Sequence, residues 1–136
     1  MVNRYALTLI VVLYLSIGNV SYAHQMFRDS EQEYQTYANK DEFYIKNDYD
    51  FAAEFSIEVF DKNMEAVDSD EWRSNVTDNT IRQNPGSVKT IKLRFRPNNQ
   101  ERKYYVCTKL QRAQDLEINV LSRICLRLLI HPTIIR

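Results

Sequence analysis

The segment SRICLRLLIHP, from Ser122 to Pro132, sets one cysteine and two arginines into an otherwise apolar run. Because successive side chains of a strand point to opposite faces, this segment and the residues before it separate into two rows. One row is aliphatic except for Ser122, and it holds Ile118, Val120, Ile124, Leu126, Leu128 and Ile130. The other row combines the cysteine with the cations, and it holds Leu121, Arg123, Cys125, Arg127 and Leu129. The pattern predicts one long strand from Leu116 to Ile130.

This strand has two interpretations. It is either the central strand of a sandwich whose arginines reach solvent at the rim, or an edge strand that offers part of its apolar row to another protein. The aliphatic row is longer than one small domain ordinarily covers, so we expect the part from Ile118 to Ser122 to be exposed. An exposed edge accepts a further strand. Weak self-association at high concentration is therefore expected.

The two cysteines of the chain, Cys107 and Cys125, fit this strand and the one before it. If they face each other across an antiparallel pair, the register centres on residue 116. That midpoint falls beside the polar link from Gln111 to Asp115, where a hairpin turn is expected. In an oxidising compartment an even cysteine count favours one disulfide. The alternative is two buried free thiols.

Two other stretches alternate in the same way. Phe55–Val59 and Ile91–Arg96 place apolar residues at odd positions and polar residues at even positions. Turn residues flank the second stretch, with Asn84–Ser87 before it and Pro97–Gln100 after it. Short alternating strands between closely spaced turns, about seven in about 110 residues, are typical of an antiparallel β-sandwich. The sequence therefore predicts an all-β, immunoglobulin-like fold.

The first 23 residues read as a signal peptide rather than as part of this domain. Arg4 precedes an apolar stretch from Tyr5 to Ile17, and Ser21 and Ala23 fit a cleavage site. An uncleaved membrane anchor is the alternative, but the apolar stretch is short for a spanning helix. We expect a cleaved signal-peptide helix over residues 1–23, a domain over 24–132 and a short tail over 133–136.

Charge is unevenly divided along a chain whose net charge is zero. Residues 24–78 hold 15 acids and 5 bases, whereas residues 79–136 hold 3 acids and 12 bases. The zero net charge gives no indication of nucleic-acid binding. Either the two halves neutralise each other in the folded domain, or the later strands present a basic surface to an acidic group on a partner.

Four segments, taken in order, resemble the N-terminal immunoglobulin-like domain of the periplasmic chaperones of the chaperone–usher pilus pathway. CLRLLIHP (125–132) resembles the end of the family's last strand, which has a basic residue, apolar residues and a proline. NPGSVKTIKLRF (84–95) resembles its proline-glycine turn and the next strand, and ERKYYVCTKL (101–110) its penultimate strand. FYIKNDYDFAAEFSIEVFD (43–61) resembles the early strand pair. One branch of the family joins its last two strands by a disulfide at the places of Cys107 and Cys125, although the connecting loop is longer in that branch.

The resemblance implies a mechanism. Such chaperones bind pilin subunits, which lack their final strand, by inserting alternate side chains of their own last strand into the subunit's groove. Here the donor residues would be Ile118, Val120 and Ser122, with a serine where a third apolar donor is expected. The family also anchors the subunit's C-terminal carboxylate on two cations, which would be Arg127 and Arg28.

The same resemblance implies the partners and the place of action. We expect pilin or fimbrial subunits and an outer-membrane usher as partners, in the periplasm, with no nucleic acid and no stable membrane insertion after signal cleavage. The family has a second sandwich domain after the proline, so a sequence ending at Arg136 reads as a one-domain or truncated relative. A secreted immunoglobulin-like binding or inhibitory domain unrelated to pili is the alternative function.

An enzyme is not expected. The two histidines, His24 and His131, lie in no spacing typical of a nucleophilic or metal site. With both cysteines in a disulfide, too few ligands are left for zinc. We expect no catalytic residue, no metal and no cofactor.

Overall fold

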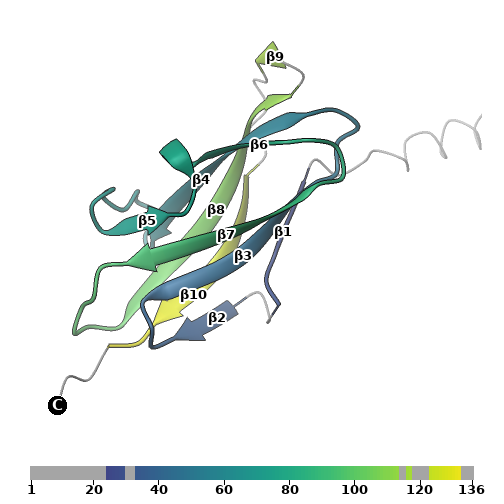
Figure 1. Cartoon of the computed structure of the whole chain (residues 1–136). Coiled ribbons are helices and arrows are strands. Elements are labelled where there is room, and N and C mark those ends of the chain that lie inside the picture. Colours follow the sequence, from purple (N-terminus) through teal and green to yellow (C-terminus); the bar gives the residue numbers. More distant parts are fainter. Residues whose placement is uncertain (1–23, 30–32, 114–115, 118–122, 133–136) are drawn as a thin grey trace, which may run out of the picture.

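The computed structural model describes residues 24–29, 33–113, 116–117 and 123–132, and they form two facing β-sheets (Figure 1). The first sheet has the strand order β1-β3-β7-β5. Its strands are β1 (His24–Phe27), β3 (Lys40–Asn47), β5 (Trp72–Ser74) and β7 (Val88–Phe95). All of its strand pairs are antiparallel.

The second sheet has the order β2-β10-β8-β4-β6, and the short β9 pairs with β8 outside this path. Its strands are β2 (Glu33–Thr36), β4 (Ala53–Asp61), β6 (Thr80–Gln83), β8 (Arg102–Ala113), β9 (Leu116–Glu117) and β10 (Arg123–Ile130). A short 3₁₀ turn, Thr77–Asn79, precedes β6. The predicted all-β, immunoglobulin-like sandwich is confirmed.

The core forms between the sheets from the apolar rows that the alternation predicts. In β7, Ile91 and Leu93 are fully buried while Lys92 and Arg94 are exposed. In β4 the odd positions turn inward in the same way. The largest fully buried side chains come from both sheets: Phe43, Phe55, Ile45, Ile91, Leu93, Leu128, Ile130 and Val106. Period two thus sets the inner face of the central strands.

The register predicted for the last strand pair is confirmed. Cys125 of β10 lies opposite Cys107 of β8, and a disulfide joins them with their Cα atoms 4.0 Å apart. The two residues are 18 positions apart in sequence. The register of β8 and β10 is therefore covalently fixed.

Residues 118–122 lie outside the described part, so the prediction of a single strand from Leu116 to Ile130 is tested only at its two ends, where β9 and β10 pair with β8 in different registers. Glu117 lies opposite Arg112, and Arg123 lies opposite Lys109. Six positions separate Glu117 from Arg123 but only three separate their partners, so the register against β8 shifts between the two pairs. Alternation along a sequence does not reveal such a change of register.

The N-terminal region also differs from a purely antiparallel sandwich. β1 lies beside β3 in the first sheet, whereas β2 runs parallel to β10 in the second. The chain therefore changes sheets between Phe27 and Glu33. The described residues form ten strands, whereas about seven were predicted. The additional strands come from this switch and from the short β5 and β9.

Several predictions fall on residues outside the described part. They are the signal peptide (1–23), the tail (133–136) and the three donor residues Ile118, Val120 and Ser122. In the portion of the chain that the structure describes, no helix has the length and apolar character needed to cross a membrane.

Candidate functional site at the edge of the last strand

β10 is flanked on both sides along only half of its length. β8 pairs with the whole strand, but β2 pairs only with residues 127–130. Among the described residues, no strand pairs with the other edge of residues 123–126 (Figure 1). Backbone N–H and C=O groups on such an edge can form a ladder with a further strand. Residues 127–130 of β10 thus match the interpretation as a central strand, and residues 123–126 match the interpretation as an edge strand.

The inward face of β10 is filled by the domain itself. Leu126, Leu128 and Ile130 are buried in the core, and Ile124 is partly buried against it. Over the described residues the apolar row therefore serves the protein's own sandwich. Apolar side chains for a partner would have to come from the segment before Arg123.

Arg127 is on the outward face, and its side chain is exposed. Among the side chains that the structure describes, which do not include that of Glu33, none forms a hydrogen bond or ion pair with its guanidinium. It lies across from Tyr105 of β8 and, on the other side, from the start of β2 at Glu33. Arg127 is thus a cation at the point where the free edge of β10 begins.

Arg28, the other predicted anchor, is buried just after β1. Its Nε and Nη2 atoms donate to the two carboxylate oxygens of Asp41 in β3, at 3.0 and 2.7 Å. Its Nη1 atom donates to the backbone carbonyl of Arg127 at 2.7 Å. The structure therefore brings Arg28 to the backbone of Arg127 but engages its guanidinium with Asp41. A contact between Arg28 and a ligand carboxylate stays a prediction.

The Arg28–Asp41 pair is almost completely shielded from water, with side chains 2% and 0% exposed. Burial raises the pKa of the Asp41 carboxyl, and the hydrogen bonds and charge of Arg28 oppose that rise. Tyr34 of β2 lies against Arg28, with the guanidinium carbon 5.7 Å from the ring centre. A buried pair of this kind is costly to break, because one charge would stay buried alone. Through its bond to the Arg127 carbonyl, Arg28 holds the end of β1 beside β10.

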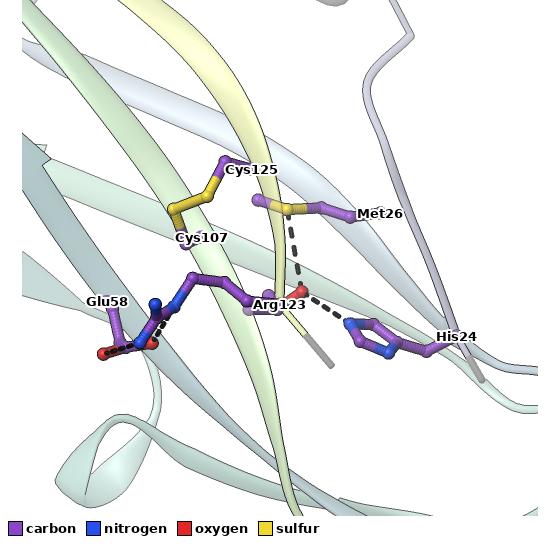
Figure 2. Close-up of a disulfide and its surroundings, with 7 residues drawn as sticks. His24, Met26, Glu58, Cys107, Arg123 and Cys125 are labelled. Atoms are coloured by element: carbon purple, nitrogen blue, oxygen red, sulfur yellow. Dashed lines mark hydrogen bonds and ion pairs between the residues drawn. A yellow bond between two sulfur atoms is a disulfide. The ribbon is translucent and has the colours of Figure 1, made fainter. Parts of the chain in front are cut away.

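The disulfide is covered by an ion pair that crosses the second sheet (Figure 2). Arg123 of β10 donates from Nε and Nη2 to the carboxylate of Glu58 in β4, at 3.0 and 3.4 Å. Its guanidinium carbon also lies 5.2 Å from the ring centre of Phe60. Glu58 lies opposite Cys107, which is fully buried although it is on the outward face. Arg123 is therefore occupied within the domain, unlike Arg127.

His24 is a core residue that the sequence interpretation did not identify. Its Nε2 atom is 3.1 Å from Thr108 Oγ1 (Figure 2). Its ring centre is 4.7 Å from that of Phe55. The Thr108 hydroxyl in turn donates to Met26 Sδ at 3.7 Å. Burial lowers the pKa of His24, against the opposing effects of Thr108 and the more distant Asp48. The alternation of HQMF, with His24 and Met26 inward, was the available signal.

Among the described residues, no group of three or more His, Cys, Asp or Glu side chains is placed to hold a metal ion. What the structure offers is a half-open strand edge with an exposed arginine at one end and a covalently fixed register. These features are more typical of a site that binds a partner strand than of a catalytic site.

No protein family model and no curated protein matches the chain. Several solved structures, however, have a similar fold. The chaperone DraB of E. coli is 14% identical, with a TM-score of 0.61 over 82% of this chain and 56% of that one. The SafB chaperone of Salmonella enterica, solved with the SafA pilin, is 12% identical, with a TM-score of 0.62 over 82% of this chain and 55% of that one. A PapD-like domain of human CEP192 is 8% identical, with a TM-score of 0.55 over 82% of this chain and 86% of that one.

The chain therefore has the PapD-like, immunoglobulin-like fold found in pilus chaperones, as the sequence resemblance predicted. It spans a little over half the length of the chaperone chains it matches. At these identities the likeness concerns the fold, and a fold alone does not specify a function.

Proposed function

We propose that the protein is a periplasmic chaperone that binds a pilin-like fimbrial subunit by lending it the free edge of its last strand. The observation that carries the proposal is the half-paired β10, which β2 covers only from Arg127 to Ile130. The fold supports it, since solved chaperones of this fold include one in complex with a pilin and one in a pre-assembly complex with a tip subunit.

The subunit would add its own edge strand alongside residues 123–126, extending the second sheet. Main-chain hydrogen bonds would supply affinity, and side chains that enter the subunit's groove would supply specificity. Ile118, Val120 and Ser122 are the proposed donors. The serine implies a groove that is shallow or tolerates a polar group at one position, because burying an unpaired hydroxyl is unfavourable.

Arg127 is the proposed contact for the subunit's C-terminal carboxylate. A guanidinium can hold a carboxylate through two parallel hydrogen bonds, and that of Arg127 is exposed on the outward face of β10. Arg28 would contribute mainly by holding the Arg127 carbonyl, because Asp41 compensates its charge. Direct contact between Arg28 and the ligand would require it to leave Asp41, which would then be a buried, unpaired acid.

Export by a cleaved signal peptide would place the protein in the periplasm, where the disulfide is stable. An outer-membrane usher would be the second partner and would receive the subunit. When no subunit is bound, the open edge would favour weak pairing between two copies.

Refolding of a fimbrial subunit from the same organism provides the test. Denatured subunit diluted into the mature protein should yield a 1:1 complex on gel filtration, and subunit diluted alone should aggregate. Arg127→Ala should weaken capture by on the order of 30-fold, equivalent to about 2 kcal/mol, because a charge-assisted anchor is lost. Arg127→Lys should retain most of the capture.

Matched controls make the result specific. Arg123→Lys keeps the charge beside Glu58 and should bind like the wild type. Circular dichroism should show that Arg127→Ala is folded, since an exposed charge contributes little to stability. If wild type and Arg127→Ala bind equally in calorimetry, Arg127 does not belong to the site, and if no complex forms the proposed function is wrong.

A second candidate is an immunoglobulin-like binding domain unrelated to pili. The observation that favours it is the match to the human CEP192 domain, of which 86% is covered. Genes for an usher and for pilins next to the gene for this chain would favour the chaperone. Their absence, together with failed subunit capture, would favour the binding domain.

A further inference from the structure

Three cations form a row across the outward face of the first sheet. Lys40 of β3 lies directly opposite Arg94 of β7, and Arg94 lies directly opposite Arg73 of β5. All three residues are exposed. Like charges directly opposite one another destabilise a sheet. Repulsion between the three cations therefore lowers the stability of the fold, and a bound anion would reduce that repulsion.

No acid of the described chain pairs with these cations. Lys40, Arg73, Arg94 and the neighbouring Lys92 form no side-chain hydrogen bond or ion pair, whereas Lys46 contacts Asp48 and Arg123 contacts Glu58. We call these four cations the basic face. The nearest acids are Glu42, across from Lys92, and Asp70 and Glu71, which share a hollow with Arg73.

Two shallow hollows flank Arg94. One, of about 270 Å³, is bordered by Lys40, Lys92 and Tyr34 and also by the acids Asp41 and Glu42. It lies beyond the end of β1, which pairs with β3 only from Tyr44 to Asn47. The other, of about 220 Å³, is bordered by Arg73, Trp72 and Arg96. Both have room for a side chain with its hydration, and Arg94 borders both.

The spacing of the row suits an extended polypeptide. Neighbouring strands are about 4.8 Å apart, so the three cations span roughly 10 Å, and same-side residues of an extended chain are about 7 Å apart. Two carboxylates at positions i and i+2 can thus each reach a pair of long, flexible cations. Among the described residues, no α-helix directs an N-terminus at this face, which would be the usual means of binding phosphate.

We propose that the basic face is a docking site for an extended acidic segment of a partner protein. It occupies the outward face of β3, β7 and β5, in the sheet opposite the one that contains β10. A partner could therefore bind here while another strand occupies the β10 edge. The site does not depend on the chaperone proposal, and its cations come from both halves of the sequence.

A fluorescein-labelled octapeptide of alternating Asp and Thr is the probe, because its carboxylates lie on one side when the chain is extended. Fluorescence anisotropy with the mature protein at low ionic strength should give saturable binding. A matched peptide of alternating Asn and Thr should not bind. Raising the salt from about 20 to about 200 mM should weaken binding by roughly fivefold or more, since the charges are exposed.

Arg94→Thr and Arg73→Thr test the location of the site. Each should weaken binding about two- to fivefold, and the double variant about tenfold, as expected for exposed ion pairs. The melting temperatures of the variants should equal or exceed that of the wild type, because a like-charge contact is removed. Lys103→Thr, an exposed cation on β8 in the other sheet, is the control and should bind like the wild type.

Other outcomes would overturn the proposal. They are equal binding of the Asn–Thr peptide, no saturable binding at low salt, or wild-type affinity in the double variant. Displacement of the peptide by pyrophosphate at a lower concentration than by unlabelled peptide would assign the face to phosphate and would equally refute a polypeptide partner.

Discussion

Arg28 connects three strands at a single side chain. It follows β1, forms two hydrogen bonds with Asp41 of β3 and a third with the Arg127 carbonyl of β10. A contact of this kind is invisible in the sequence, because 13 and 99 positions separate Arg28 from its two partners. The sequence marked Arg28 as a cation near the site, but only the fold shows that its charge is already compensated.

Removing the Arg28 side chain should therefore affect folding first. Arg28→Ala should lower the free energy of unfolding by roughly 3 kcal/mol, because it leaves the Asp41 carboxylate buried without a partner. Urea unfolding at neutral pH measures this. Adding Asp41→Asn to Arg28→Ala should recover part of the loss. Lys46→Ala, which breaks an exposed ion pair, should cost less than about 0.5 kcal/mol, and an equal loss in the two single variants would contradict a special role for Arg28.

His24 gives the fold a pH dependence of predictable sign. Burial lowers the pKa of His24 in the folded state below the usual histidine value of about 6.5, so the unfolded chain binds a proton first as the pH falls. The stabilisation from the neutral histidine is thus complete above about pH 6.5 and is lost as the pH falls towards the lower folded-state pKa, with a slope of up to about 1.4 kcal/mol per pH unit.

Urea unfolding at pH 7.5 and pH 5.5 measures the contribution of His24. The loss of stability between the two pH values should be larger in the wild type than in His24→Gln, which cannot titrate. Parallel curves for wild type and His24→Gln would mean that His24 is not buried as a neutral ring.

At the scale of the strand, the last hairpin is the best-specified element. Cys107 and Cys125 alone indicate its register, and the polar link indicates its turn. The disulfide closes a loop of about 18 residues, worth roughly 3 kcal/mol through the entropy of the unfolded chain. Its covalent link also prevents slippage, which would reverse the faces of Arg127 and Leu128.

Replacement of both cysteines by serine should lower the free energy of unfolding by about 2–4 kcal/mol. The fully buried position of Cys107 adds to the loss, since a serine hydroxyl would have to find a partner there. Denaturant unfolding measures the change. Before reduction, the purified protein should react with no thiol reagent, and full reaction would show that the disulfide is absent.

Other elements could not be derived from the sequence. Period two identifies the inward face of β4 and β7, but it does not say which strands are neighbours. The sheet change between β1 and β2 depends on contacts with β3 and β10, both distant in sequence. The change of register between β9 and β10 is hidden as well, because the sequence of residues 116–130 alternates across it.

Over the whole molecule, the two halves of the sequence neutralise each other only in part. The acid-rich half supplies Glu58 to Arg123, a pair that spans the second sheet. It also supplies Lys40 and Arg73 to the basic face, where they meet Arg94. The sequence predicted that a basic surface could exist, but its position depends on cross-strand register and so required the fold.

The half-open edge of β10 also makes a prediction about the assembly state. With no subunit bound, two copies can pair along residues 123–126, whose outer edge no described strand covers. Sedimentation velocity should therefore show weak, concentration-dependent dimerisation. Because such pairing uses the edge that we propose binds the subunit, added subunit should dissociate the dimers. This competition distinguishes edge pairing from association through the basic face, which added salt should disrupt instead.

Val120→Lys tests whether the segment before β10 takes part. A lysine there should suppress both dimerisation and subunit capture, because a charge cannot enter an apolar groove without a large desolvation cost. Arg123→Lys keeps its charge beside Glu58 and is the matched control, for which neither property should change. If Val120→Lys instead lowers the free energy of unfolding as a core substitution does, by several kcal/mol, then Val120 is buried in the protein's own sandwich and the edge available to partners is confined to residues 123–126.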